Sequence, residues 1–456
     1  MSHELSAVHN SLKTTIDKIP QPWSESYRWK KQLHGRFYYN MESLKDLQLR
    51  YESLKGLGLK LNIERGQPGD DNFNLSNALL NMVTEKDIMT KSGFDIRNYP
   101  GGVLGLPEAR EFFCGILGAK PEETLVGNNA SLLILSKILM WALLRGVVGS
   151  PAPWNKIDKP KMIVTVPGYD RHFLLLSEMG FEMIQVKMTP DGPDMAEVEK
   201  AVADPAVKGI LFVPTYSNPT GDTVSDETVT RLASMKTAAP DFTIFADDAY
   251  VVHHLVGNPK KPKNLLRACE EAGNPNRVYL FSSTSKITFS SSGLGFMATS
   301  VANLTYISKL FGTMFIGPNK AEQLRHVKFL SAYPGGVVGL MKEHAKLLKP
   351  KFDISEKVLS QELGSGGLAT WSKPQGGYFI SLDTAKPVAK RAVALCKEAG
   401  VAITPAGATF PFGKDPKDAN IRISPTRPPV AELEKAIEVL AVCIKLASAE
   451  LDGAGK

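Results

Sequence analysis

The sequence has little cysteine and no long apolar run, and both shortages narrow the classes of protein to which it can belong. Its four cysteines stand far apart among 456 residues and show no paired metal-ligand spacing, so we expect reduced thiols, no metal site and a cytoplasmic location. The most apolar helical stretch, residues 132–144, is interrupted by Ser136 and Lys137. The amino terminus has no apolar signal core, so no segment is expected to span a membrane.

The chain also lacks a strong excess of charge of either sign. Its 54 lysines and arginines stand against 47 aspartates and glutamates, and the net charge of +7 is spread along the chain. This balance gives no reason to expect a nucleic-acid partner, although it suits small anionic ligands. With 43% hydrophobic and 22% charged residues the composition is that of an ordinary globular protein, long enough for two or three domains.

The order of the predicted elements indicates an α/β fold with a large and a small lobe. Apolar strands alternate with helices over about residues 106–301, as in a mainly parallel sheet covered on both faces. The predicted strands are residues 162–166, 183–186, 210–213, 243–246, 278–281 and 296–299. Helices are expected over residues 41–57 and 319–348, with a change of pattern after Pro350. The expected division is an amino-terminal arm (1–40), the first part of a small domain (41–100), a large domain (101–330) and the rest of the small domain (331–456).

Residues suited to chemistry follow successive predicted strands. In parallel α/β sheets, ligands bind beyond the carboxyl ends of the strands, so these side chains are expected to meet. They are Tyr169, Asn218, Asp247, Tyr250 and Lys286. Upstream, residues 125–131 open a helix whose free N–H groups and positive dipole end form an anion site.

Lys286 is the most informative of these residues. It follows the apolar strand 278–281 within a hydroxyl-rich stretch, and burial there would lower its pKa and let the amine attack a carbonyl. Taken alone the signal is weak, because most lysines after strands are solvated surface residues. Together the residues match pyridoxal 5′-phosphate, which needs a lysine for its aldehyde, a carboxylate for its ring nitrogen and a helix terminus with hydroxyls for its phosphate.

The motifs as a set resemble the fold-type I pyridoxal-phosphate aminotransferases, and more closely the aspartate aminotransferase subgroup termed Ic. They run in the family's order through most of the chain and comprise residues 65–68, 97–102, 167–173, 217–221, 247–250, 283–288, 317–320, 376–382 and 420–423. The resemblance implies a large domain with a mainly parallel central sheet between helices, plus a smaller α+β domain. It also implies a homodimer with shared active sites, and a ping-pong exchange of an amino group between an L-amino acid and a 2-oxo acid, of the aspartate/2-oxoglutarate type.

The resemblance assigns roles around the cofactor ring. Lys286 would attach the cofactor covalently and move the proton at the substrate α-carbon. Asp247 would pair with the ring nitrogen. Asn218 and Tyr250 would bond the 3′-oxygen, and Tyr169 would stack on the ring.

Further roles concern the phosphate and the substrate. By resemblance the phosphate would be surrounded by Asn128, Asn129, Ala130, Ser131, Ser283 and Ser285. Tyr99 would reach in from the second subunit. Arg422 would bind the substrate α-carboxylate through its guanidinium, and Gly66 would lie close to the substrate.

Two positions depart from the common pattern. Most fold-type I aminotransferases carry a phosphate-binding arginine eight residues after the lysine, and here this position is Leu294. The Ic subgroup also lacks this arginine, so the departure fits the subgroup. Aspartate-specific members carry an arginine five residues before the asparagine that corresponds to Asn319, and here Met314 stands there. Another arginine such as Arg65 would then bind the distal carboxylate, or the enzyme would prefer aromatic or other apolar amino acids. A pyridoxal-phosphate lyase and a non-enzymatic regulator on the same fold are further alternatives.

Overall fold

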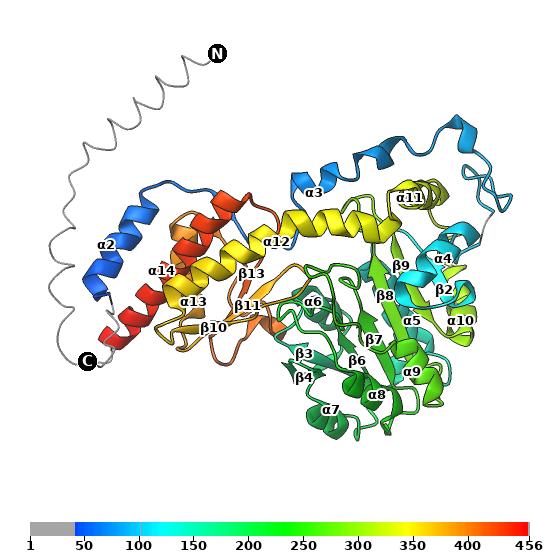
Figure 1. The fold of residues 1–456 in the computed structure, drawn as a ribbon. Coiled ribbons are helices and arrows are strands. Elements are labelled where there is room, and N and C mark those ends of the chain that lie inside the picture. Colours follow the sequence, from blue (N-terminus) through cyan, green and yellow to red (C-terminus); the bar gives the residue numbers. More distant parts are fainter. Residues whose placement is uncertain (1–41, 101, 455–456) are drawn as a thin grey trace, which may run out of the picture. The chain divides into compact units, whose positions relative to one another are not determined.

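The computed structural model describes residues 42–100 and 102–454, so the predicted amino-terminal arm lies outside the described residues. Within the described part, eight strands form one sheet (Figure 1). In spatial order they are β2 (Thr124–Val126), β9 (Gly295–Thr299), β8 (Val278–Ser283), β7 (Thr243–Asp247), β6 (Val207–Phe212), β3 (Lys161–Val166), β4 (Glu182–Thr189) and β5 (Gly192–Pro193). The five strands from β8 to β4 run parallel, while β9 is antiparallel to β8 and β2, and β5 is antiparallel to β4. The predicted α/β fold with a mainly parallel sheet is confirmed.

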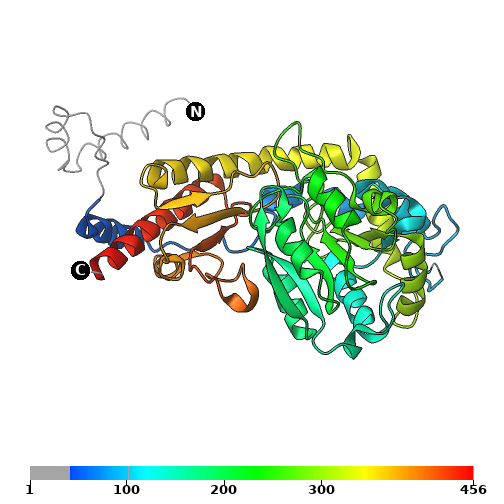
Figure 2. The same ribbon diagram turned by 90° about the horizontal axis from the view of Figure 1, so that it is seen from below.

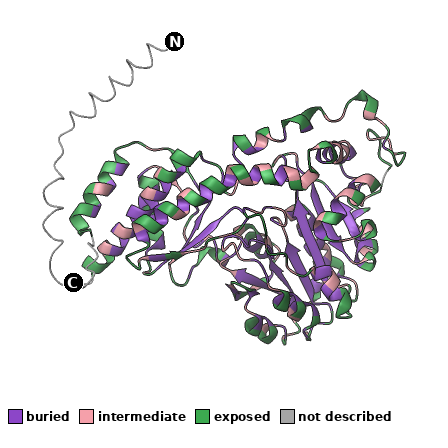
Figure 3. Cartoon of the chain, viewed as in Figure 1, coloured by how far each residue is buried: buried purple, intermediate pink, exposed green. Residues whose placement is uncertain are grey.

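Alternate side chains of the central strands pack on opposite faces of this sheet, as the two-residue period of a strand requires. In β7, Ile244 and Ala246 belong to one core cluster and Phe245 to the other. The first cluster is closed by α4 (Pro107–Cys114), α7 (Met195–Ala201), α8 (Asp226–Ser234), α9 (Leu265–Glu271) and α11 (Lys320–Ala332). The second is closed by α5 (Ser131–Arg145), α6 (Asp170–Glu178) and α10 (Val301–Phe311). The central strands are therefore buried on both faces (Figure 3).

A second, antiparallel sheet lies in the carboxyl-terminal part of the chain. It has the order β10 (Ala369–Trp371), β11 (Ile380–Thr384), β13 (Asn420–Ile423). Its core cluster includes α2 (Leu44–Lys55), α13 (Ala389–Glu398) and α14 (Val430–Ala454). A short parallel pair, β1 (Leu61–Asn62) with β12 (Val401–Ala402), ties the segment after α2 to this part, and α3 (Asp70–Asn74) follows.

Helix α12 (Gly336–Leu363) joins the two core clusters. It lies beside α14 (Figure 2). Leu340 packs in a cluster of the large sheet, and Phe352 packs in the cluster of the small sheet. The helical region predicted to end at residue 348 does not end there, because α12 continues through Pro350. Packing at both ends outweighs the roughly 3 kcal/mol that an interior proline costs a helix. The change to mixed helices and strands predicted for the following segment is confirmed.

The single helical region predicted over residues 319–348 is also divided. α11 ends at Ala332 and α12 begins at Gly336. Gly335 and Gly336 adopt φ angles of 76° and 60°, which a side-chain-bearing residue adopts only at a cost. The predicted helix over residues 41–57 is confirmed as α2, where the Ser43 side chain accepts a hydrogen bond from the Asp46 backbone N–H at 3.2 Å.

The division into domains at residues 100 and 330 stays a prediction. Leu79, which precedes the first boundary, packs in the cluster of the large sheet, and α12 contributes to both clusters.

Candidate active site

A cavity of about 480 Å³ lies at the carboxyl ends of β6, β7 and β8. Segments of the small-sheet part, including Phe379, Thr404 and Arg422, form its other wall. The structure brings together most of the site residues expected from the sequence. Those that line the cavity are Arg65, Gly66, Ala130, Ser131, Tyr169, Asn218, Asp247, Tyr250, Ser283, Ser285, Lys286 and Arg422. Asn128, Asn129 and Tyr99 are not among its lining residues.

Lys286 follows β8 by three residues and is partly buried at the cavity wall. Its Nζ lies 5.2 Å from the centroid of the Tyr250 ring and 5.9 Å from that of Tyr378. Burial lowers the pKa of Lys286, while the charge of Asp247 opposes part of that shift. A lowered pKa keeps more of the amine in the unprotonated, nucleophilic form.

Asp247 ends β7 beside Phe281 of β8, and its carboxylate is held from one side only. His172 Nε2 donates to Oδ2 of Asp247 at 3.0 Å, and both residues are buried. The other oxygen, Oδ1, is buried and has no hydrogen-bond partner among the described residues. A buried carboxylate oxygen without a donor is costly, and the protonated ring nitrogen of pyridoxal phosphate is a donor of the right charge for it. The residues present therefore fit this cofactor.

Tyrosines and an amide surround the space beside Asp247. Burial raises the pKa of Tyr250 well above its ordinary value, and burial together with Asp247 raises the pKa of Tyr169 to about 12. Both phenols therefore remain neutral hydrogen-bond donors at physiological pH. The Tyr169 ring meets His172 edge-on, with centroids 4.9 Å apart. Asn218 is buried, and its Oδ1 lies 3.4 Å from Nη1 of Arg422.

Hydroxyls and the start of α5 form the end of the cavity suited to a phosphate. Ser283 Oγ lies 3.2 Å from Ser285 Oγ, which donates to Oδ1 of Asn129 at 3.0 Å. A Cβ at Gly295 would lie 2.6 Å from the carbonyl carbon of Ala130, so this glycine lets β9 approach the loop before α5. Asn129 thus acts on the serine rather than lining the cavity itself.

The remaining expected positions lie elsewhere. Asn128 Oδ1 accepts a hydrogen bond from the Asn319 backbone N–H at 2.8 Å, and Tyr99 is 70% exposed. Leu294 is fully buried in a cluster of the large sheet, so it takes part in the core and not in phosphate binding. Gly66 lines the cavity, and a Cβ there would lie 2.4 Å from the Phe379 ring.

Arg422 on β13 stands opposite Ser381 of β11 and is 6% exposed. Its Nη1 donates to Oδ1 of Asp170 at 2.8 Å, and its Nε to Oγ1 of Thr404 at 3.3 Å. Its guanidinium carbon lies 4.9 Å from the centroid of the Phe379 ring. Stacking and hydrogen bonds together fix the plane of the guanidinium at the cavity wall.

Sequence reasoning missed His172 and Asp170. Both lie in α6, directly after Tyr169, and each meets a residue far away in the chain. A usable signal was present for His172: it stands one helical turn after Tyr169, which places the two side chains on one face. Nothing in the sequence pairs Asp170 with Arg422.

Met314, at the position of the expected distal-carboxylate arginine, does not line this cavity. Its side chain is 43% exposed, and its sulfur accepts a hydrogen bond from Nε1 of Trp141 at 3.2 Å. Arg65 and Arg171 both line the cavity and are exposed.

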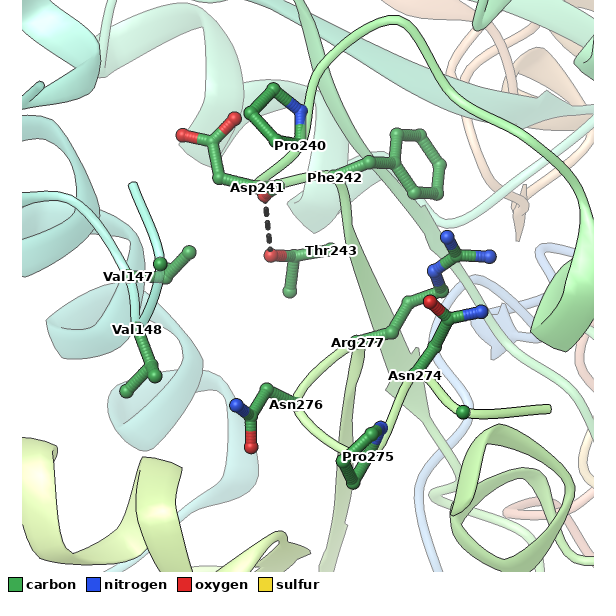
Figure 4. Close-up of a pocket in the computed structure, with 12 residues that line it drawn as sticks. Val147, Val148, Pro240, Asp241, Phe242, Thr243, Asn274, Pro275, Asn276 and Arg277 are labelled. Carbon is green, nitrogen blue, oxygen red and sulfur yellow. Dashed lines mark hydrogen bonds between the residues drawn. The ribbon is translucent and has the colours of Figure 1, made fainter. Parts of the chain in front are cut away.

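A separate cavity of about 230 Å³ lies at the opposite edge of the sheet, before the amino ends of β7 and β8 (Figure 4). Its charged groups are bound within the protein. Asp241 accepts hydrogen bonds from Lys208 and Trp154, each at 2.8 Å, and Arg277 donates to the backbone carbonyls of Ala233 and Met235, each at 2.9 Å. Parallel sheets bind ligands at the carboxyl ends of their strands, so we place the active site in the cavity that contains Lys286.

This fold, with an amine, a half-paired carboxylate and a buried arginine around one cavity, defines a fold-type I aminotransferase whose cofactor is pyridoxal phosphate. The sequence matches the family described as Aspartate amino-transferase over residues 40–454, and the chain belongs to that family. The family decides against the lyase and the non-enzymatic regulator as alternatives.

Individual relatives agree with this assignment. A putative aminotransferase of Mycolicibacterium smegmatis is 44% identical over 88% of this chain and 94% of its own length. An aspartate aminotransferase of Corynebacterium glutamicum is 42% identical over 89% of this chain and 93% of its own length. The crystal structure of an aspartate transaminase from C. glutamicum has a TM-score of 0.87 at 41% identity, covering 90% of this chain and 96% of that chain. Among the described residues, no helix has the length and apolar character needed to cross a membrane.

Proposed function

We propose that this aminotransferase takes its amino group from aspartate and passes it to a 2-oxo acid of the 2-oxoglutarate type. The main support for this proposal is that three arginines line one cavity, namely Arg65, Arg171 and Arg422. A dicarboxylic substrate needs a cation for each of its two carboxylates, and guanidinium groups bind carboxylates in a bidentate manner. The aspartate aminotransferase of C. glutamicum, 42% identical to this chain, supports the same substrate class.

The positions of the cavity residues support a role for each of them in this reaction. We propose that Arg422, buried and fixed in plane, binds the α-carboxylate, and that Arg65 and Arg171, both exposed, reach the distal carboxylate. Bound pyridoxal phosphate supplies an aldehyde that accepts the amino group and a ring that withdraws electrons from the α-carbon. Asp247, hydrogen-bonded to His172, would keep the ring nitrogen charged. Lys286 Nζ would attach the cofactor and would accept and return the proton of the substrate α-carbon.

The groups around the ring position the cofactor in this proposal. Tyr250 and Asn218 would donate hydrogen bonds to its 3′-oxygen, and Tyr169 would pack against the ring. The phosphate would be held by neutral donors, namely the hydroxyls of Ser283 and Ser285 and the backbone at the start of α5. Asn129, bonded to Ser285, and Asn128 support this end from outside the cavity.

An enzyme for aromatic or other apolar amino acids is the second candidate, and Met314 is the observation that favours it. A thioether cannot compensate a carboxylate, so without another cation aspartate would lose a charge-assisted contact of roughly 1.5–3 kcal/mol. The two exposed arginines at the cavity are the reason to prefer aspartate.

We also propose a homodimer with active sites at the interface. Large apolar side chains are exposed on adjoining segments: Tyr99 is 70%, Ile316 60% and Met314 43% exposed. Lys320 Nζ donates to the backbone carbonyls of Asn98 and Tyr99, which holds these segments together. Exposed apolar side chains gathered in this way favour a protein contact, and Tyr99 would reach the partner's phosphate end. Light scattering coupled to size-exclusion chromatography would test the mass.

The substrate proposal is tested by adding single amino acids to the holoenzyme and following cofactor absorbance. Aspartate should convert the aldehyde form to the amino form at far lower concentration than asparagine, which has the same shape without the distal charge. Equal efficiency for the two would contradict a dicarboxylate site. A response to phenylalanine or methionine alone would favour the second candidate.

A further inference from the structure

The arginine that is proposed to bind the substrate is already hydrogen-bonded to a carboxylate of the protein itself. Asp170 Oδ1 accepts a hydrogen bond from Nη1 of Arg422 at 2.8 Å, and both residues line the cavity. This is the geometry in which an α-carboxylate would bind, so the two carboxylates compete for one nitrogen.

The other bonds of Arg422 leave little room for both carboxylates. Nε donates to Thr404 at 3.3 Å, and Nη1 also lies 3.4 Å from Oδ1 of Asn218. A bidentate carboxylate uses two neighbouring N–H groups of the guanidinium, and with Nε directed to Thr404 this pair must include Nη1. Nη1 has two N–H groups and contacts both Asp170 and Asn218, so substrate binding in this mode displaces one of these two side chains. Asn218 is buried, which leaves Asp170 as the side chain to be displaced.

Asp170 is the partner that can move. The side chain of Arg422 is 6% exposed, and it is fixed by Thr404 and by the Phe379 ring. The side chain of Asp170 is 28% exposed, and Arg422 is its only hydrogen-bond partner among the described residues. As the first residue of α6, Asp170 keeps favourable interactions with the helix amino terminus after it leaves Arg422.

We propose that Asp170 is an internal competitor for the substrate carboxylate. It neutralises the buried guanidinium while the cavity holds no acid, gives way when an amino acid or 2-oxo acid binds, and returns as the product acid leaves. Asp170 thus weakens the binding of every ligand that carries a carboxylate at this position, whatever its side chain. The inference rests on the proposed role of Arg422 and not on the identity of the side chain.

The test uses the holoenzyme and its Asp170→Asn and Asp170→Ser variants, with calorimetric binding of two unreactive acids. Succinate has two carboxylates, and 3-phenylpropionate has one carboxylate and an aromatic ring; neither has an amino or keto group. Both should bind about tenfold more tightly to the variants, a gain that corresponds to ~1.4 kcal/mol. The KM values for amino acid and 2-oxo acid should fall together, by more than kcat changes.

Asp226→Asn is the matched control, because Asp226 is the first residue of α8, a helix of the same nine-residue length as α6, outside the cavity. It removes a helix-terminal carboxylate and should leave both affinities unchanged. Weaker or unchanged binding in both Asp170 variants would overturn the proposal and make Asp170 a support for Arg422. A gain for succinate alone would also overturn it, since Asp170 would then repel the distal carboxylate. If Arg422→Ala binds both acids as wild type does, the proposed role of Arg422 fails first.

Discussion

His172 Nε2 donates a hydrogen bond to Oδ2 of Asp247 at 3.0 Å, and the two side chains are 3% and 5% exposed. The bond leaves Oδ1 of Asp247 as the oxygen without a hydrogen-bond partner among the described residues, and Asp247 lines the cavity in which the cofactor is expected. His172 would therefore position the carboxylate, while Asp247 itself touches the ring.

This relationship predicts that His172 acts through Asp247. His172→Phe keeps an aromatic ring against Tyr169 but removes the hydrogen bond, and Asp247→Asn removes the charge. Each change should weaken the affinity for pyridoxal phosphate, by about tenfold or more for the aspartate change, because charge-assisted hydrogen bonds contribute about 1.5–3 kcal/mol. Equilibrium titration of the apoenzyme measures both affinities.

The double variant that combines His172→Phe with Asp247→Asn tests whether the histidine acts only through the carboxylate. If His172 acts through Asp247, the loss in the double variant should equal that of Asp247→Asn alone, because the histidine then has no carboxylate to orient. Losses that add up fully would show that the histidine contributes independently.

Replacing Arg422 should damage the binding of all substrates alike. Arg422→Lys keeps the positive charge but loses the planar fork, and we expect KM to rise by about 100-fold for aspartate and alanine equally. Steady-state kinetics with both donors measures this ratio. A rise confined to aspartate would place Arg422 at the distal carboxylate instead.

Replacing the exposed arginines should instead change selectivity. Arg65→Ala and Arg171→Ala are each expected to lower kcat/KM for aspartate, and the more important of the two by about ten- to a hundredfold, as the loss of a charge-assisted contact predicts. The value for alanine, which has no distal carboxylate, should stay within about twofold and serves as the internal reference. If neither variant changes the ratio of the two values, the distal carboxylate is bound elsewhere, and Met314→Arg becomes the informative change.

The buried side chain of His344 should make the folded protein less stable in acid. His344 Nδ1 accepts a hydrogen bond from Asn72 Nδ2 and its Nε2 donates to the carbonyl of Ile287, each at 3.0 Å, so only the neutral ring satisfies both. Burial lowers the pKa of His344 to about 4, below the ordinary value of 6.5. The unfolded chain therefore takes up this proton first, and stability should fall as the pH drops from about 6.5 to 4, by on the order of 2–3 kcal/mol.

His344→Gln provides the comparison, because glutamine offers a donor and an acceptor without titrating. Urea unfolding between pH 7.5 and 4 should show a smaller loss of stability in the variant than in wild type. Parallel curves would mean that His344 does not set this part of the pH dependence.

The sequence predicts the sheet well because its central strands are apolar on both faces. Residues 243–246 and 278–281 read as short buried runs, and the structure gives β7 and β8 at these positions. The course of α12 was not predictable in the same way. Pro350 signals a break locally, and only the contacts at both ends of the helix explain why it continues.

In the active site, too, some features could be predicted from the sequence and others could not. Residues that follow a strand, such as Asn218 and Asp247, are predictable because strand ends of a parallel sheet share one edge. The partners of these residues depend on folding: Asp170 and Arg422 are 252 positions apart, and His172 and Asp247 are 75 apart. The position of Tyr99 outside its own cavity is likewise a property of the folded chain.

Borohydride reduction of the holoenzyme followed by peptide mass mapping identifies the lysine that holds the cofactor. The reduced cofactor should be found on the peptide containing Lys286, and Lys286→Ala should carry no covalently attached cofactor. Cofactor attached to a different lysine in the wild-type protein would show that Lys286 does not have this role.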